Sequence, residues 1–220
     1  MGDADIERGE ADGLPFLFRS GQEIESPTVC LLHGLGGDEN SMWVFAHAFP
    51  PGWGLLAPRA LYPYATGYSW TENGPPSRFS AFDDASRRLR SFIPMAAKAA
   101  ASDPETVVWV GFSQGAALAV SALLRGVSGK ACAMLSGFVP EGAQGSLPAL
   151  PVFWAHGRRD RDVPLARARA DADLLLSMGA QVEFCEADVD HRVGAACTSA
   201  LSRWLRALPI PSADRPSRFP

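Results

Sequence analysis

The sequence lacks long hydrophobic runs and an excess of positive charge. No apolar stretch approaches the roughly 18 residues of a transmembrane helix, and residues 1–12 are too acidic and polar for a secretory signal. Lys and Arg number 20 against 24 Asp and Glu, a net charge of −4, which argues against nucleic acid as the main partner. We therefore expect a cytoplasmic protein that acts on small molecules, without stable membrane insertion.

Cysteine is also scarce. The four cysteines, Cys30, Cys132, Cys185 and Cys197, are scattered, and no two form a Cys-x-x-Cys pair. This distribution favours buried free thiols in a reducing compartment over disulfides or a metal site. No metal and no cofactor is expected.

The bulk composition is that of one globular domain. A length of 220 residues with 47% hydrophobic and 20% charged residues suits a single α/β domain with a full core. We expect a flexible N-terminus over residues 1–12, the domain over 13–208, and a loose proline-rich tail over 209–220. An exposed apolar patch could make a homodimer, but the sequence does not locate one.

Strand-like and helical patterns alternate along the chain. Strands are predicted at 14–19, 28–32, 54–57, 106–110, 130–135, 151–155 and 181–187. Helices are predicted at 40–49, 81–101, 114–125, 164–178 and 193–208. This order predicts an α/β fold with a mostly parallel, doubly wound sheet and helices on both faces.

The longest stretch expected to be irregular, residues 59–80, is rich in aromatic residues. It carries Tyr62, Tyr64, Tyr68, Trp70 and Phe79. One interpretation is an aromatic loop packed on the surface, and the other is one wall of an apolar binding cleft. The sequence does not decide between them, although loops of this length in compact domains are often functional.

The most informative motif is Gly111-Phe112-Ser113-Gln114-Gly115. It joins the predicted strand 106–110 to the predicted helix 114–125. A Gly-x-Ser-x-Gly in that position is typical of a nucleophile elbow, in which a tight strained turn lifts the serine hydroxyl above the sheet edge. Ser113 is therefore the candidate nucleophile. The alternative is a Gly-Ser turn that only ends a strand.

A serine hydroxyl needs a base that takes its proton, usually histidine, and the chain has only four histidines. His191 follows the last predicted strand and precedes the last helix. It alone combines a strand-end loop with the chain order serine, acid, histidine that this type of sheet uses. We therefore predict His191 as the base.

The acid should follow a strand between Ser113 and His191. Asp160 and Asp162 both lie in the loop after residues 151–155, and spacing alone does not choose between them. Backbone N–H groups must also hold the oxyanion. Gln114, the residue after the serine, offers one, and Leu35 in the glycine-rich stretch His33-Gly34-Leu35-Gly36-Gly37 offers the other.

Together these motifs resemble the phospholipase/carboxylesterase family, the small α/β-hydrolases that include acyl-protein thioesterases and bacterial carboxylesterases. The matching stretches run in order from about residue 14 to 208: 33–38, 67–70, 111–115, 135–140 and 156–164. The resemblance implies an α/β-hydrolase fold, and it favours Asp160 over Asp162 because Asp160 stands four residues before the motif's proline, Pro164. One departure is Asp190, where many relatives have glycine.

Residues 137–150 leave no room for the helical lid that larger lipases insert, so we expect no cap domain and an open, shallow site for small esters. Trp70 and Phe138 are expected to line the acyl side, and Val163 to contact substrate. The predicted function is a serine carboxylesterase for short- to medium-chain acyl esters. The alternatives are a thioesterase on acyl-proteins or acyl-coenzyme A, a lysophospholipase, or a non-catalytic binding module.

Overall fold

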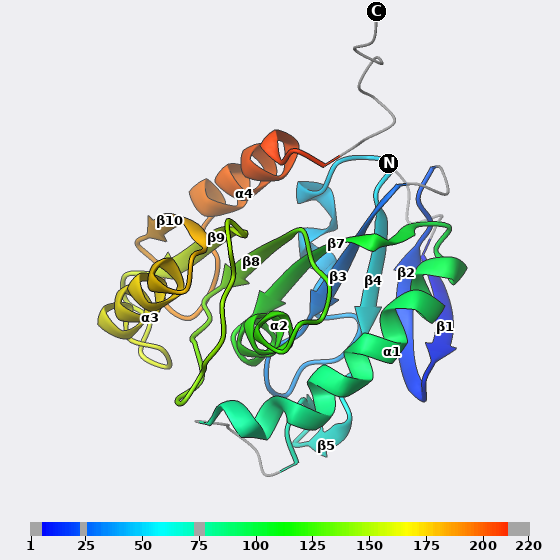
Figure 1. The fold of residues 1–220 in the computed structure, drawn as a ribbon, viewed down its shortest axis with the longest axis horizontal. Helices are drawn as coiled ribbons and strands as arrows, with labels where there is room; N and C mark the ends of the chain where they lie inside the picture. Colours follow the sequence, from blue (N-terminus) through cyan, green and yellow to red (C-terminus); the bar gives the residue numbers. More distant parts are fainter. Residues whose placement is uncertain (1–5, 23–25, 73–77, 211–220) are drawn as a thin grey trace, which may run out of the picture.

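An eight-stranded sheet forms the centre of the computed structural model, which describes residues 6–22, 26–72 and 78–210 (Figure 1). The strand order is β1-β2-β4-β3-β7-β8-β9-β10, with β1 and β2 antiparallel and the neighbours from β4 to β10 parallel. The strands are β1 (Glu7–Ala11), β2 (Leu14–Arg19), β3 (Pro27–Leu32), β4 (Gly54–Pro58), β7 (Asp103–Phe112), β8 (Ala131–Leu135), β9 (Pro151–Gly157) and β10 (Gln181–Ala187).

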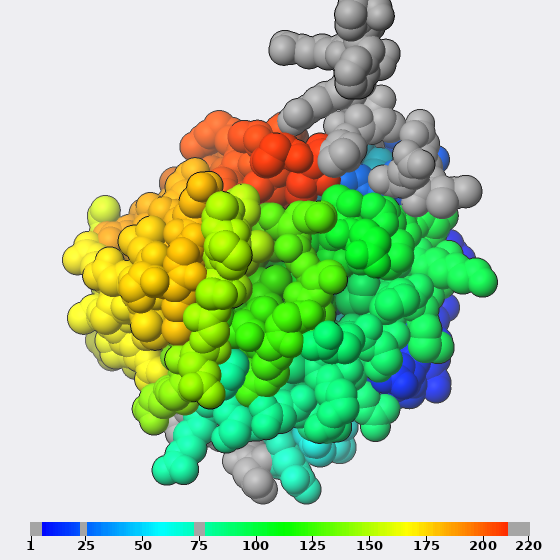
Figure 2. Space-filling view, in the orientation of Figure 1, coloured from blue at the N-terminus to red at the C-terminus, as the bar shows by residue number. Residues whose placement is uncertain are grey.

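Helices cover both faces of the sheet, as the alternation predicts. One face packs against α1 (Asp83–Ala99), α2 (Gln114–Leu124) and α3 (Leu165–Ser177). The other packs against a short 3-10 helix, η1 (Trp43–Ala48), and α4 (Ala195–Ala207). Figure 2 shows this face, with α1 and α2 as neighbours and α3 beyond the segment that joins β8 to β9.

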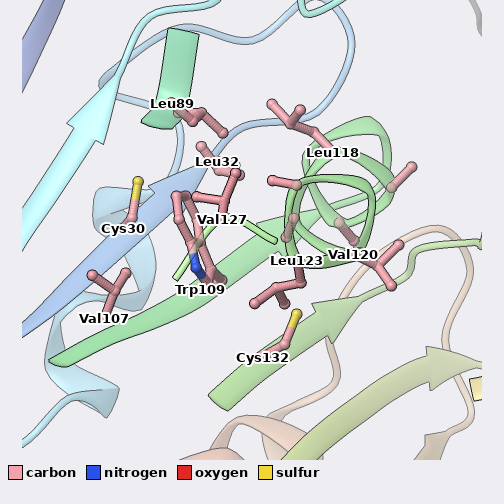
Figure 3. Close-up of a cluster of buried hydrophobic side chains, with 14 of the residues drawn as sticks. Cys30, Leu32, Leu89, Val107, Trp109, Leu118, Val120, Leu123, Val127 and Cys132 are labelled. Atoms are coloured by element: carbon pink, nitrogen blue, oxygen red, sulfur yellow. The ribbon is translucent and has the colours of Figure 1, made fainter. Parts of the chain in front are cut away.

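The central strand β7 is buried on both sides because each face contributes to a separate core. Trp109 faces the α1–α2 side with Cys30 and Leu89, and Figure 3 shows side chains of β3, β7 and β8 meeting those of α1 and α2. Val108 and Val110 face the η1–α4 side. Because both faces of β7 are buried, the strand is held in one position in the sheet. Its C-terminal end therefore holds Ser113, the next residue, at the edge of the sheet.

The α/β-hydrolase fold is confirmed, with three local corrections. The expectation that residues 1–12 are flexible is wrong for Glu7–Ala11, which pair in register with β2 as an edge strand; residues 1–5 lie outside the described residues. The stretch 59–80 is not irregular throughout, because β5 (Tyr62–Tyr64) and β6 (Gly67–Ser69) form a hairpin. Residues 40–49 contain only η1, because turns occupy residues 39–42.

The expectation of four free thiols is also wrong. Cys185 on β10 and Cys197 on α4 form a disulfide across the strand–helix connection, with their Cα atoms 5.8 Å apart. Cys30 and Cys132 are free and buried, as predicted. Within the described ranges, no helix is long and apolar enough to cross a membrane. Most of the expected proline-rich tail, residues 211–220, lies outside them.

Candidate active site

Ser113 occupies a strained turn between β7 and α2. Its φ of 51° and ψ of −114° lie in a region that non-glycine residues rarely adopt. Glycine is required on both sides, because a Cβ on Gly111 would overlap the backbone of Gly115 and a Cβ on Gly115 would overlap the carbonyl of Leu32. The turn therefore has the geometry expected of a nucleophile elbow.

The structure brings Ser113, His191 and Asp160 together from three separate loops. The Nε2 atom of His191 lies 2.9 Å from the Oγ of Ser113, and its Nδ1 lies 2.7 Å from Oδ2 of Asp160. The His191 ring also packs against the ring of Phe112, with centroids 5.1 Å apart. An imidazole held at both nitrogens can accept the serine proton at Nε2 while Nδ1–H donates to the carboxylate.

The geometry favours Asp160 over Asp162. Asp160 is 6% exposed, and its Oδ1 accepts hydrogen bonds from the backbone N–H groups of Asp162 and Val163 at 3.0 and 2.9 Å. The Asp162 carboxylate lies 4.0 Å from the His191 Nδ1, and its side chain is 73% exposed. Two backbone donors and burial fix the Asp160 side chain, whereas solvent surrounds that of Asp162.

Asp190, the departure from the family pattern, does not face the imidazole. Its carboxylate pairs with the guanidinium of Arg192, a contact on the exposed surface. The backbone carbonyl of Asp190 packs so close to Gly157 that no Cβ fits there. The carboxylate therefore does not share in the hydrogen bonds that orient His191.

The glycine-rich loop after β3 lies directly against the elbow. A Cβ on Gly34 would lie 3.4 Å from the Cβ of Ser113. Within the described part of the chain, the N–H groups of Leu35 and Gln114 donate to no protein acceptor. Backbone N–H groups without a protein acceptor are what an oxyanion site needs. Gln114 follows Ser113 directly, and Leu35 follows Gly34, which packs against Ser113.

The buried side chain of His33 holds this loop in place through two hydrogen bonds. The N–H of Ala60 donates to its Nε2 at 3.0 Å, so its Nδ1 carries the hydrogen and donates to the carbonyl of Gly34 at 2.7 Å. Burial lowers the pKa of His33, so the neutral imidazole is favoured. The hairpin holds the other side of the loop, because Tyr68 exchanges backbone hydrogen bonds with Gly36 and Gly37.

Trp70, which the sequence led us to expect on the acyl side of the site, is buried in the core. It is 1% exposed, its Nε1 donates to the carbonyl of His33, and its N–H donates to the side chain of Gln114. The Gln114 amide also donates to the hydroxyls of Ser69 and Thr71. Ser69, Trp70 and Thr71 therefore brace the segments that carry the two candidate oxyanion donors.

Phe138 and Val163 also have packing contacts that the sequence did not reveal. The guanidinium of Arg167 lies over the Phe138 ring at 5.3 Å, and Val163 is buried with its carbonyl accepting from the Nε2 of His156. Neither borders the large cavity beside Ser113. That cavity, about 730 Å³, lies between the glycine-rich loop, η1 and the start of α4, and no sequence motif indicated a pocket there.

One group of side chains has spacing that could suit a cation. The ligand atoms of Asp160, Asp162 and His191 lie within 4.8 Å of one another. Both imidazole nitrogens of His191 are already engaged, with Asp160 and with Ser113, so a metal would compete with those hydrogen bonds. The donor set fits the hydrogen-bonded arrangement better than a metal site.

Comparison with known proteins agrees with the fold. The model of the phospholipase/carboxylesterase family matches residues 17–208. A carboxylesterase from Mesorhizobium loti is 23% identical, with a TM-score of 0.80 over 92% of this chain and 99% of the other. The Bacillus cereus carboxylesterase is 23% identical, with a TM-score of 0.77 over 88% and 93%.

A curated relative from rice, Oryza sativa subsp. japonica, is 29% identical over 180 residues, 71% of this chain and 74% of that protein. It is described as a probable inactive carboxylesterase.

Proposed function

The chain belongs to the phospholipase/carboxylesterase family, and we propose that it is an active serine carboxylesterase for short- to medium-chain acyl esters. The observation that carries the proposal is the continuous hydrogen-bonded line from Ser113 Oγ through His191 to Asp160, at 2.9 and 2.7 Å. Membership of the family alone implies a small ester substrate. The geometry supports catalysis by this chain.

In the proposed reaction, Ser113 Oγ attacks the ester carbonyl carbon and its proton passes to Nε2 of His191. The N–H groups of Leu35 and Gln114 then hold the oxyanion of the tetrahedral intermediate. His191 returns the proton to the departing alcohol oxygen, which leaves an acyl group on Ser113. Water attacks that acyl-enzyme, again with His191 as base, and releases the acid while Ser113 regains its proton.

A non-catalytic role is the alternative, because the rice relative is described as a probable inactive carboxylesterase. Loss of activity in hydrolase-like proteins usually follows loss of a triad member. Ser113, Asp160 and His191 are all present here and within hydrogen-bond reach of one another. This arrangement supports the active enzyme.

The test is hydrolysis of p-nitrophenyl acetate by the unaltered chain and by Ser113→Ala. The substitution is expected to lower kcat by about 10⁴- to 10⁶-fold with folding intact. Ser177→Ala, an exposed serine on α3, is the matched control and should hydrolyse the ester at the parent rate. Parent activity in Ser113→Ala would exclude Ser113 as the nucleophile.

A further inference from the structure

The cavity beside Ser113 has the size of a ligand pocket. Its volume of about 730 Å³ falls within the roughly 300–1,000 Å³ typical of small-molecule sites. Its walls come from the glycine-rich loop, from η1 and the residues before it, and from the loop and helix that follow His191. We call this cavity the η1–α4 cleft.

The cleft lies next to the candidate catalytic residues, because their chain neighbours line it. Leu35, whose N–H is a proposed oxyanion donor, lines it. Phe112 and Arg192, the chain neighbours of Ser113 and His191, line it as well. An unbranched group attached to a carbonyl carbon at Ser113 Oγ would therefore need to extend only past these neighbours to enter the cleft.

The chemistry of the walls is mainly apolar. Met42, Val44, Phe45, Phe112 and Val193 all border the cleft, and Val44 is 65% exposed at its rim. Among the described residues that line the cleft there is no carboxylate, and the guanidinium of Arg192 is paired with Asp190. An apolar wall with an exposed valine at its rim suits a hydrocarbon group better than a charged one.

Resting on the proposed esterase function, we infer that the η1–α4 cleft binds the unbranched alkyl chain of the ester substrate. Val44 lies at its rim, and Ser199 on α4 lines the facing wall. The chain can belong to the acid or to the alcohol, because both are attached to the carbonyl carbon held at Ser113. Chain-length preference is thus set on this side of the site, away from Trp70, Phe138 and Val163.

Two series of esters test the inference and show whether the bound alkyl chain comes from the acid or from the alcohol. The first keeps p-nitrophenol as leaving group and lengthens the acyl chain from acetate to butyrate, hexanoate and octanoate. The second keeps the acetyl group and lengthens an unbranched alcohol. In one series, kcat/KM should rise by up to about fourfold for each methylene that enters the cleft.

Ser199→Phe fills the cleft, and Val44→Asp places a charge at its rim. Each is expected to reduce the kcat/KM ratio of the longest to the shortest ester at least tenfold. Ala196→Phe adds the same bulk at an exposed α4 residue that does not line the cleft, and Leu176→Asp adds the same charge to an exposed residue of α3. Both controls should keep the parent ratio, and thermal melting checks that all four variants fold.

In one of the two series, Ser199→Phe and Val44→Asp should reduce the dependence of kcat/KM on alkyl length. That series shows whether the bound alkyl chain belongs to the acid or to the alcohol. If acetate esters are hydrolysed but neither series depends on chain length, the cleft does not bind the chain. The inference also fails if kcat/KM depends on alkyl length and both Ser199→Phe and Val44→Asp keep the same dependence. Failure of the proposed function is a distinct result, since the unaltered chain would then not hydrolyse even p-nitrophenyl acetate.

Discussion

Reduction of the Cys185–Cys197 disulfide is expected to destabilise the fold measurably. The bond joins the end of β10 to the first turns of α4 and spans 12 residues, including the loop that carries His191. Closing a loop of that length lowers the entropy of the unfolded chain by an amount worth about 3 kcal/mol at 25 °C. For a chain of this size, the loss corresponds to a fall in melting temperature of roughly 6–12 °C.

The assay compares urea unfolding with and without a thiol reductant. The two remaining cysteines, Cys30 and Cys132, are free thiols, so the reductant has no bond to break at either of them. Cys185→Ala is the matched control, because this variant should already have the lower stability and the reductant should not change it further. Thiol titration of the denatured chain should find two free thiols before reduction and four after it.

This reasoning is refuted if the denatured, unreduced chain titrates four thiols. It is also refuted if the reductant leaves the urea midpoint of the unaltered chain unchanged while two further thiols appear. The first result would exclude the bond, and the second would exclude its contribution to stability.

Two further predictions concern the hydrogen bonds around the site. Asp160→Asn should lower kcat by about 10³- to 10⁴-fold, because an amide no longer selects the required His191 tautomer, whereas Asp162→Asn should change kcat less than about threefold. Stability should fall as the pH drops below about 6.5: the pKa of His33 is lowered by burial, so the unfolded state takes up the proton first. Urea midpoints between about pH 8 and pH 5 should shift less in His33→Gln than in the exposed-residue control His47→Gln, and equal shifts would exclude His33 as the cause.

Features of the site encoded by a short stretch of chain could be predicted from the sequence. The elbow at Ser113 depends on a buried strand, a helix and two glycines within a few residues, and all are legible in the sequence. Spacing alone did not choose between Asp160 and Asp162, because both follow the same strand, and it was the resemblance to the family motif that favoured Asp160. Two backbone N–H groups that fix the Asp160 carboxylate, and the burial of that side chain, make the difference in space.

Features that depend on distant segments escaped sequence reasoning. Trp70 was expected on the acyl side as part of an aromatic stretch that matches the family, but its indole N–H donates to the carbonyl of His33 inside the core. The η1–α4 cleft is lined from three segments, and single side chains such as Val44 carry no sign of it. The disulfide likewise depends on the 5.8 Å Cα separation that the packing of α4 against β10 creates.

The central claim is that Ser113 is a reactive nucleophile activated by His191. The most direct measurement is labelling of the folded chain with a fluorophosphonate probe, followed by mass spectrometry of its peptides. The account predicts one phosphonylated residue, Ser113, with labelling abolished in Ser113→Ala and strongly slowed in His191→Ala. A folded chain that takes up no probe, or takes it up on another serine, would contradict it.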